Sequence, residues 1–356
     1  MASIQEIARR ARISPGTVDR VLHNRGRVSA RTERKVRQII KRLGYKGNIY
    51  ARNLSLGKVF RFGVVMPKLS QDSGYWRIPA NGINRAKSEL ETHRASVLYY
   101  HYDRYSEPSF RKAIRRAVME NPDGLLIAPV LSDVAREIIN GIPTAIPYVF
   151  FDSHVPGTQC LSMIGQEAFP SGVLAAKLMH LLVPETGRTA ARRTVALMRV
   201  LPNDIHIEER IKGFHSYIRN FPHIHTVVYD VDSNKGEAGF AEVLDTVFAE
   251  SHGLVGVFVS NAWTHPVANY LKKHELTGKV RLIGYDVIPG NVQCLKEGTI
   301  DFIISPRPEM QGYYGIHSLY RHVMLKEPVR KKVEVPVDIL TRENIAYYRG
   351  EEEDEG

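Results

Sequence analysis

The segment 3–22 reads SIQEIARRARISPGTVDRVL. Ser3 and Glu6 are spaced as a capping box, in which each side chain bonds the backbone amide of the other, and the apolar residues after them recur at helical intervals. Ser14 and Pro15 end that pattern and favour a second helix, because serine caps a helix and proline fits its first position. Two short helices joined by a turn of about three residues predict a helix-turn-helix, whose second helix enters the major groove of DNA.

A third helix is predicted over about Ala30 to Leu43, with Ser29 as its cap and Gly44 just after its end. Its apolar positions would close a three-helix core, and its other face is rich in Arg and Lys. The first 61 residues contain sixteen Lys or Arg and three acids, a net charge of +13, whereas the whole chain carries +11. The basicity is therefore confined to this N-terminal module, as expected of a module that binds nucleic acid.

Four runs in this module carry a family resemblance: Ile4-x-x-Ile7-Ala8, Ser14-x-x-Thr17-Val18-x-Arg20-Val21-Leu22, Val28-Ser29-x-x-Thr32-x-x-Lys35-Val36 and Leu43-Gly44-Tyr45. They resemble, in order, the DNA-binding headpiece of the lactose-repressor (LacI/GalR) family. The run 51–54 that follows resembles the hinge helix of that family, in which a leucine, here Leu54, is wedged into the minor groove and bends the duplex. The alternative for Leu54 is an ordinary core residue between domains.

The resemblance implies which residues contact DNA. These are Ser14, Pro15, Gly16, Thr17, Arg20, His23, Asn24, Arg27, Ser29 and Leu54. Pro15 and Gly16 depart from the family, because their positions usually carry side chains that hydrogen-bond to bases. We therefore expect base discrimination to depend on Arg20, on neighbours such as His23 and Asn24, and on DNA shape. Each arginine outside this set could equally be a solvated cation that only adds to the field.

From Arg61 onward, short apolar runs alternate with segments long enough for crossover helices, which is typical of parallel strands buried on both faces. Predicted strands cover 62–66, 96–100, 124–128, 148–151, 194–198, 226–229, 255–259 and 280–284. Four of them precede residue 152 and four follow residue 193, so we expect an α/β fold of two doubly wound lobes. Ligands bind such sheets at the carboxyl ends of the strands, which predicts a site in the cleft between the lobes.

This arrangement resembles the periplasmic-binding-protein-like (type I) effector domain that the same family fuses to its headpiece. The implied organisation is a headpiece over 1–48, a hinge over 49–60, an effector domain over 61–345 and an acidic tail over 346–356. We expect the N-lobe to comprise 61–155 and 306–330, and the C-lobe 156–304 and 332–345. The three crossings between lobes are placed near 153–156, 305–308 and 330–333, and one closing strand over about 332–340.

Six residues match the ligand-binding positions of that family: Tyr75, Trp76, Asp152, Arg210, Asn261 and Asp286. Carboxylates accept from adjacent hydroxyls, Arg and Asn donate, and aromatic rings stack on a sugar, so the set suits a polyol. The alternatives are helix or turn caps for the two acids, a structural ion pair for the arginine, and lobe-surface packing for the two aromatics. Pro306 and Gln166 depart from common family residues, which leaves the identity of the effector open.

Other classes of protein find little support in the sequence. The two cysteines are too few for a disulfide framework or a zinc site, and no stretch of about 18 apolar residues or secretory leader occurs. We find no phosphate loop, nucleophile elbow or two-histidine metal helix, and we take the 14 histidines, His206 included, as surface or packing residues. The sequence predicts a cytoplasmic, homodimeric repressor that binds operator DNA and a sugar-like effector, without cofactor, metal, catalysis or membrane contact. The alternative is a sugar-binding protein for transport or sensing.

Overall fold

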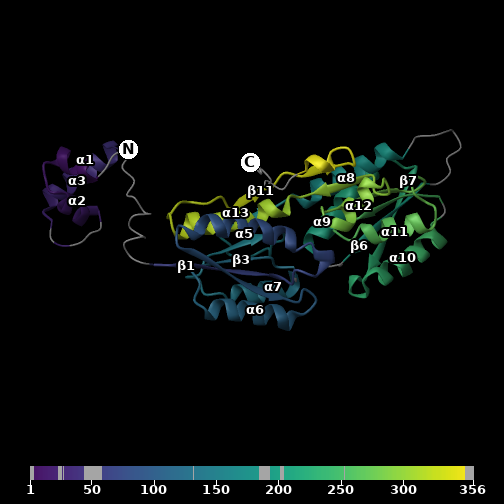
Figure 1. The fold of residues 1–356 in the computed structure, drawn as a ribbon, viewed down its shortest axis with the longest axis horizontal. Coiled ribbons are helices and arrows are strands. Elements are labelled where there is room, and N and C mark those ends of the chain that lie inside the picture. The colour runs from purple at the N-terminus through teal and green to yellow at the C-terminus, as the bar shows by residue number, and fades with distance from the viewer. Residues whose placement is uncertain are drawn as a thin grey trace. The chain divides into compact units, whose positions relative to one another are not determined.

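A computed structural model describes residues 4–22, 26, 28–43, 58–130, 132–183, 193–200, 204–251 and 253–348 (Figure 1). The chain divides into two compact units, residues 1–58 and residues 59–356. We call the first the headpiece and the second the two-lobed unit, and each is described by itself. The predicted class, an all-α headpiece followed by two α/β lobes, is confirmed.

The described part of the headpiece contains three helices, α1 (Ile4–Ala11), α2 (Pro15–Leu22) and α3 (Ala30–Leu43), as the apolar spacing predicts. Their buried side chains form one small core, made of Ile7, Ala8, Ala11, Val18, Val21 and Val36. Ser14 and Ser29 cap α2 and α3, since each hydroxyl accepts from the backbone amide three residues later, at 3.2 and 3.3 Å. Ser3, the first member of the predicted capping box, lies outside the described residues, and the Glu6 carboxylate pairs with Arg9 and Arg10.

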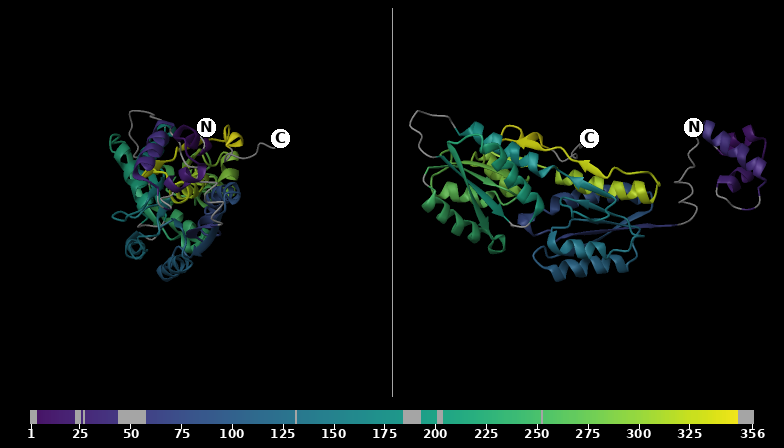
Figure 2. Two further views of the ribbon diagram at one scale, coloured as in Figure 1. Left: turned by 90° about the vertical axis from the view of Figure 1, so that its left-hand side faces the viewer. Right: turned by 180° about the vertical axis from the view of Figure 1, so that it is seen from behind.

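The two-lobed unit is built on two six-stranded sheets (Figure 2). The N-lobe sheet has the order β11-β5-β4-β3-β1-β2 and the C-lobe sheet the order β12-β10-β9-β8-β6-β7. All recorded pairings are parallel except that of β12 with β10. The N-lobe strands are β1 (Phe60–Pro67), β2 (Ala95–Tyr102), β3 (Gly124–Ile127), β4 (Tyr148–Phe151), β5 (Ser162–Gly165) and β11 (Lys332–Glu334). The C-lobe strands are β6 (Arg193–Val200), β7 (Ile224–Val231), β8 (Leu254–Val259), β9 (Arg281–Tyr285), β10 (Phe302–Ser305) and β12 (Asp338–Leu340).

Helices cover both faces of each sheet, as parallel strands require. In the N-lobe, α5 (Arg77–Glu91) and α13 (Pro308–Val323) lie on one face, and α6 (Glu107–Met119) and α7 (Ser132–Asn140) on the other (Figure 1). In the C-lobe, α8 (Ala168–Leu182) and α9 (Ile205–Ile218) share one core cluster. The opposite face holds α10 (Glu237–Glu250), α11 (His265–Lys273) and α12 (Pro289–Lys296).

The lobe boundaries predicted from the sequence are wrong at two crossings. Strand β5 pairs with β4 and therefore belongs to the N-lobe, so the chain crosses after Gly165 and not near 153–156. The predicted closing strand 332–340 is two strands, β11 beside β5 and β12 beside β10, so the third crossing lies between them. A strand of three or four residues has too little pattern to reveal which sheet it joins.

A close contact between α8 and α9 in the C-lobe positions Phe169 and Arg210. A Cβ atom added at Gly172 would collide with the carbonyl oxygen of Arg210, and one at Gly213 with that of Phe169. Glycine at both positions lets the two helices approach at backbone distance. Arg210 and Phe169 are thereby held on neighbouring backbones.

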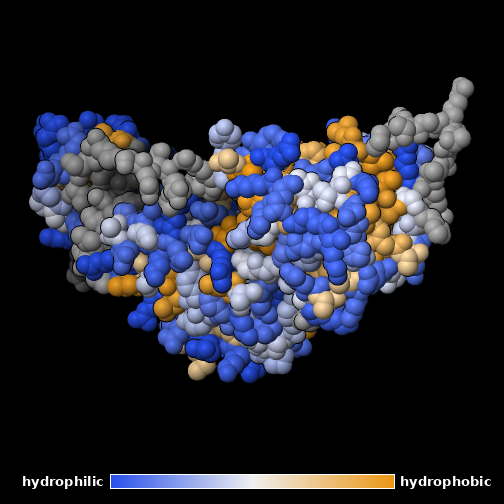
Figure 3. Space-filling model, turned by 45° about the vertical axis from the view of Figure 1, so that its right-hand side comes forward, coloured by the Kyte–Doolittle hydropathy of each residue, from blue (hydrophilic) through white to orange (hydrophobic). Residues whose placement is uncertain are grey.

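The surface of the two-lobed unit is drawn by hydropathy in one view (Figure 3). On the face drawn in Figure 3, hydrophilic residues predominate and apolar residues form scattered patches. Among the described residues, none of the helices has the length and apolar character needed to cross a lipid bilayer.

Candidate functional site

The headpiece presents part of the predicted DNA-binding set on its surface. Ser14, Pro15, Gly16, Arg20 and Ser29 are exposed, and Thr17 is half-buried with its hydroxyl 2.9 Å from that of Ser14. All of these except Ser29 lie on α2 or at its cap. His23, Asn24, Arg27 and Leu54 lie outside the described residues, as does the predicted hinge 51–54.

The other face of α3 supplies the cations. Exposed side chains there are Arg31, Arg34, Lys35, Arg37, Lys41 and Arg42, and the acid among them, Glu33, pairs with Arg37. The clustered charge expected from the sequence is therefore spread along one helix and remains accessible to solvent. Such a surface suits a polyanion.

In the two-lobed unit, the predicted polar residues converge at the carboxyl ends of the strands, as predicted for parallel sheets. One narrow cavity between the lobes is lined by all six predicted effector residues, together with Asp72, Arg104, His206, Ile207 and Ala262. Its volume is about 20 Å³, which is room for about one water molecule. Protein side chains therefore fill the site, and a sugar ring could enter only if the lobes or these side chains moved.

Asp152 and Asp286 hold equivalent places in the two lobes. Each follows the strand that lies fourth in chain order within its lobe, β4 or β9. Each has a left-handed backbone, with φ of 65° and 69°, and donates its amide to the next strand, at the carbonyl of Ile164 or Ile304. The strain of φ > 0 at two non-glycine residues marks both positions as specialised.

The aromatic pair is buried and its polar atoms are engaged. Burial raises the pKa of the Tyr75 phenol well above its usual value, so the hydroxyl keeps its proton and donates to Asp152 at 2.5 Å. The indole N–H of Trp76 donates to Asp72 at 2.7 Å, and the two rings meet edge to face with centroids 5.0 Å apart. Both rings line the cavity, which favours the cleft assignment over lobe-surface packing.

Arg210 and Asn261 belong to the C-lobe, and contacts with neighbouring residues hold their side chains in place. The guanidinium of Arg210 lies over the Tyr285 ring at 3.8 Å and donates to the carbonyl of Ser260 at 2.6 Å. Gln166 also accepts a hydrogen bond from the Arg210 guanidinium when its side-chain amide oxygen is turned toward it. The Asn261 side-chain oxygen accepts from the backbone of Trp263, at 3.1 Å.

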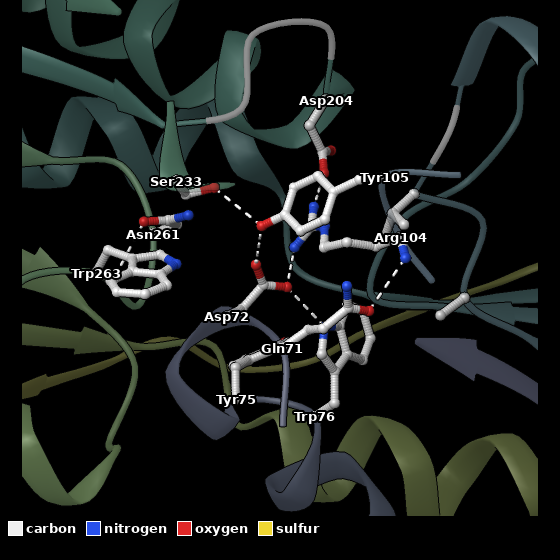
Figure 4. Close-up of polar contacts among 12 residues, drawn as sticks. Gln71, Asp72, Tyr75, Trp76, Arg104, Tyr105, Asp204, Ser233, Asn261 and Trp263 are labelled. Atoms are coloured by element: carbon white, nitrogen blue, oxygen red, sulfur yellow. Dashed lines mark hydrogen bonds and ion pairs between the residues drawn. The ribbon is translucent and has the colours of Figure 1, made fainter. Parts of the chain in front are cut away.

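A polar network that the sequence analysis missed joins the two lobes (Figure 4). Arg104, after β2, pairs with Asp72 in its own lobe and, at 3.3 Å, with Asp204 at the start of α9 in the other. Beside it the Tyr105 hydroxyl lies 2.9 Å from that of Ser233, after β7. Strands β2 and β11 form the two edges of the N-lobe sheet, and β7 and β12 form those of the C-lobe sheet. These links start after β2 and β7, so they join the lobes on the side away from the three chain crossings. We call this group, Asp72, Arg104, Tyr105, Asp204 and Ser233, the interlobe bridge.

The missed residues had a usable sequence signature. Arg104 and Tyr105 follow the second predicted strand, so the strand-end rule applied to the other strands would have included them. His206 was taken as a surface or packing residue, and that prediction is wrong. Its side chain lines the cavity, and its Nδ1 atom lies 2.8 Å from the Asp204 carboxylate. Burial lowers the pKa of His206, the Asp204 charge raises it more, and the net shift is upward.

The surroundings of Asp286 shift the pKa of its carboxylate strongly. Burial raises its pKa to about 7, although the Arg210 charge acts in the opposite direction. One carboxylate oxygen is buried without a hydrogen-bond partner among the described residues. A buried acceptor of this kind is available to a ligand hydroxyl.

The raised pKa of Asp286 makes a pH-dependent prediction. Its value in the folded protein, about 7, exceeds the unfolded value, so between these values the unfolded state binds fewer protons and stability falls as pH rises. Asp286→Asn removes this penalty, so the variant should gain about 2–3 kcal/mol relative to the parent between pH 5 and pH 8. Urea unfolding of both proteins at the two pH values measures this. A difference that does not change with pH would contradict it.

Comparisons with known proteins agree with this architecture. Residues 62–327 match the family model of the periplasmic binding protein domain, and residues 3–48 match that of the bacterial regulatory proteins of the lacI family. The xylose/arabinose-binding protein XylF of Sulfolobus acidocaldarius is 22% identical over 65% of this chain and 60% of its own length. Catabolite control protein A of Staphylococcus aureus is 30% identical over 41% of this chain and 43% of its own. The chain therefore spans less than two thirds of the length of either relative.

Solved structures give the same fold. One from Bacteroides fragilis, assigned as a LacI transcriptional regulator, is 28% identical, has a TM-score of 0.71 and covers 82% of this chain and 100% of its own. A solute-binding protein from Burkholderia graminis in complex with D-arabinose is 19% identical, with a TM-score of 0.73, over 82% of this chain and 98% of its own. The second likeness shows the fold alone. The match over 62–327 places this chain in the periplasmic binding protein domain family, with a headpiece over 3–48 that matches the lacI family of bacterial regulatory proteins.

Proposed function

We propose that this chain is a DNA-binding transcriptional regulator, a repressor, whose affinity for operator DNA is set by a sugar or sugar derivative bound between its two lobes. The observation that carries the proposal is the joint presence of two sites in one chain. A headpiece with exposed cations on α3 suits DNA, and an interlobe cavity with paired carboxylates suits a polyol. The cleft binds and does not catalyse in this proposal.

On the DNA side, α2 is the recognition helix. Arg20 reads a base edge, Thr17 and the caps Ser14 and Ser29 contact the backbone, and Pro15 and Gly16 allow close approach. His23, Asn24 and Arg27 extend the contact, and Leu54 enters the minor groove. Two copies of the chain form a homodimer in the cytoplasm and occupy the two halves of a pseudo-palindromic operator.

On the effector side, Asp152 and Asp286 accept hydroxyls from opposite lobes, and Arg210 and Asn261 donate to ring or hydroxyl oxygens. Tyr75 and Trp76 provide the apolar wall. Binding requires the interlobe bridge to rearrange, since about 20 Å³ is free in its present state. A change in the angle between the lobes then alters the hinge over 49–60 and with it the operator affinity. A transport protein would share the cleft but would have no use for a cationic headpiece.

Electrophoretic mobility shift with fragments from around the gene of this chain tests the DNA side. We expect retardation at low salt, with an association constant that falls by about 0.9 log units per log unit of salt for each neutralised phosphate. An affinity independent of salt, or no retardation at low salt, would refute the proposal.

Arg20→Ala is expected to weaken operator binding by about 10- to 100-fold and to weaken binding to random DNA far less, because a base contact carries sequence information. Arg34→Ala, also an exposed arginine, is the matched control, and it should weaken both by a similar factor. Fluorescence anisotropy with labelled operator and scrambled duplexes gives both constants. Equal losses on the two duplexes for Arg20→Ala would remove it from base readout.

A further inference from the structure

A second, larger cavity adjoins the narrow one. Its volume is about 540 Å³, and its lining shares Asp152 and His206 with that of the inner cavity. The N-lobe contributes Ser153 and His154 after β4, and the C-lobe contributes Phe169 on α8 and Glu209 on α9. We call this space the outer chamber.

The outer chamber has an apolar surface of the kind that takes a ring. Phe169 is 40% exposed, unlike most phenylalanines of this protein, and it lies at the start of α8. Its backbone is fixed, because its carbonyl lies against Gly213 on α9. An exposed aromatic ring on a rigid backbone offers a stacking platform for the apolar face of a ligand ring.

Polar groups around that ring are mixed in sign. The chamber is lined by the cations Lys331 and Lys332 and by the acids Glu167 and Glu209, and Lys332 pairs with Glu167. An anionic group such as a phosphate would meet these carboxylates as well as Asp152, so the lining favours a neutral ligand that both donates and accepts hydrogen bonds. Polyhydroxylated rings have this chemistry.

Two side chains are available to such a ring. Among the described residues, neither the Ser153 hydroxyl nor the His154 ring has a hydrogen-bond partner, and both line the outer chamber. Burial, with the neighbouring Lys332 and His206 charges, lowers the pKa of His154, so its ring is neutral near pH 7 and can both donate and accept.

We propose that the effector is a disaccharide or glycoside: one sugar ring lies among Asp152, Arg210 and Asp286, and the second ring stacks on Phe169 in the outer chamber, with the linkage passing between Asp152 and His206. This inference rests on the proposed function. It adds a second subsite and excludes a free monosaccharide as the tightest-binding effector.

The test compares disaccharides of glucose, galactose, mannose, xylose and arabinose with their constituent monosaccharides. Melting temperature shifts of the full chain identify the saccharides that bind, and isothermal titration calorimetry gives the dissociation constants. We expect at least one disaccharide to bind at least tenfold more tightly than either of its monosaccharides. Phe169→Ala should weaken that disaccharide about tenfold and leave the monosaccharides unchanged, whereas Phe169→Trp should retain most of the affinity.

Leu181→Ala is the matched control, because Leu181 is an exposed apolar residue on the same helix outside the lining of both cavities. Leu181→Ala should leave the dissociation constants of all saccharides unchanged. The second subsite is overturned if monosaccharides bind as tightly as their disaccharides, or if Phe169→Ala and Leu181→Ala behave alike. A monosaccharide response that Asp286→Asn abolishes would overturn the second subsite yet support the proposed function. No shift with any saccharide would overturn both.

Discussion

Asp286→Asn is expected to shift the response to saccharides to about 10- to 100-fold higher concentrations while leaving operator affinity in their absence unchanged. The residue is 4% exposed and aims an unpartnered carboxylate oxygen into the cleft, so it is a strong acceptor for a ligand hydroxyl. Asparagine tolerates the same left-handed backbone but can accept at only one oxygen. Loss of a buried charged hydrogen bond should weaken saccharide binding by about 10- to 100-fold.

The measurement is a saccharide titration followed by melting temperature, together with operator anisotropy for the unliganded proteins. Asp245→Asn is the control, since Asp245 is an exposed acid on α10 of the same lobe and bonds only Tyr270 among the described residues. It should behave as the parent does. If Asp286→Asn keeps the full response to saccharides, the saccharide does not bind at Asp286 in the cleft.

Arg104→Ala is expected to lower the free energy of unfolding of the two-lobed unit substantially. The guanidinium is 7% exposed and stands between two buried carboxylates, Asp72 in its own lobe and Asp204 in the other. Removal of one partner from a buried ion pair leaves uncompensated charge, at a cost of about 3–5 kcal/mol. The lobes also lose the ionic link that Arg104 makes between them, so the unit should adopt a more open average structure.

Urea unfolding and small-angle X-ray scattering measure the two effects. Lys68→Ala is the matched control, because Lys68 pairs with Asp103 beside the same strand end but is half exposed. Its loss should cost at most about 1 kcal/mol and leave the radius of gyration unchanged. If Arg104→Ala is no more destabilised or expanded than Lys68→Ala, the interlobe bridge does not hold the lobes together.

Local pattern was enough to predict the headpiece and most of the sheets. The three described helices of the headpiece depend on caps and apolar spacing within a few residues of sequence. The eight predicted strands overlap β1, β2, β3, β4, β6, β7, β8 and β9. Each of these is a long or continuously apolar run, which alone indicates a strand. The six inner strands fit burial on both faces, whereas the edge strands β2 and β7 are partly exposed. The convergence of Asp152, Arg210, Asn261 and Asp286 followed from the family resemblance and from the rule that sites form at strand ends.

The remainder depends on contacts between distant segments. Strands β5 and β11 are short; β5 is assigned to the N-lobe by its pairing with β4, and β11 by its pairing with β5 across more than 150 residues. The strand-end rule could have marked Arg104 and Tyr105 as candidates, but their partners in the interlobe bridge could not be predicted, because Arg104 meets Asp204 only when the two lobes are folded and facing. His206 was misassigned for the same reason, since its role depends on which helix start faces the other lobe.

A repressor controlled by a saccharide must show reciprocal linkage between operator binding and saccharide binding. Operator affinity of the full chain is measured by anisotropy without and with a saturating amount of the saccharide that raises the melting temperature most. The affinity for that saccharide is then measured by calorimetry without and with operator. The account predicts that both affinities change by the same factor, about 5- to 150-fold. An operator affinity that is identical at zero and saturating saccharide would contradict it.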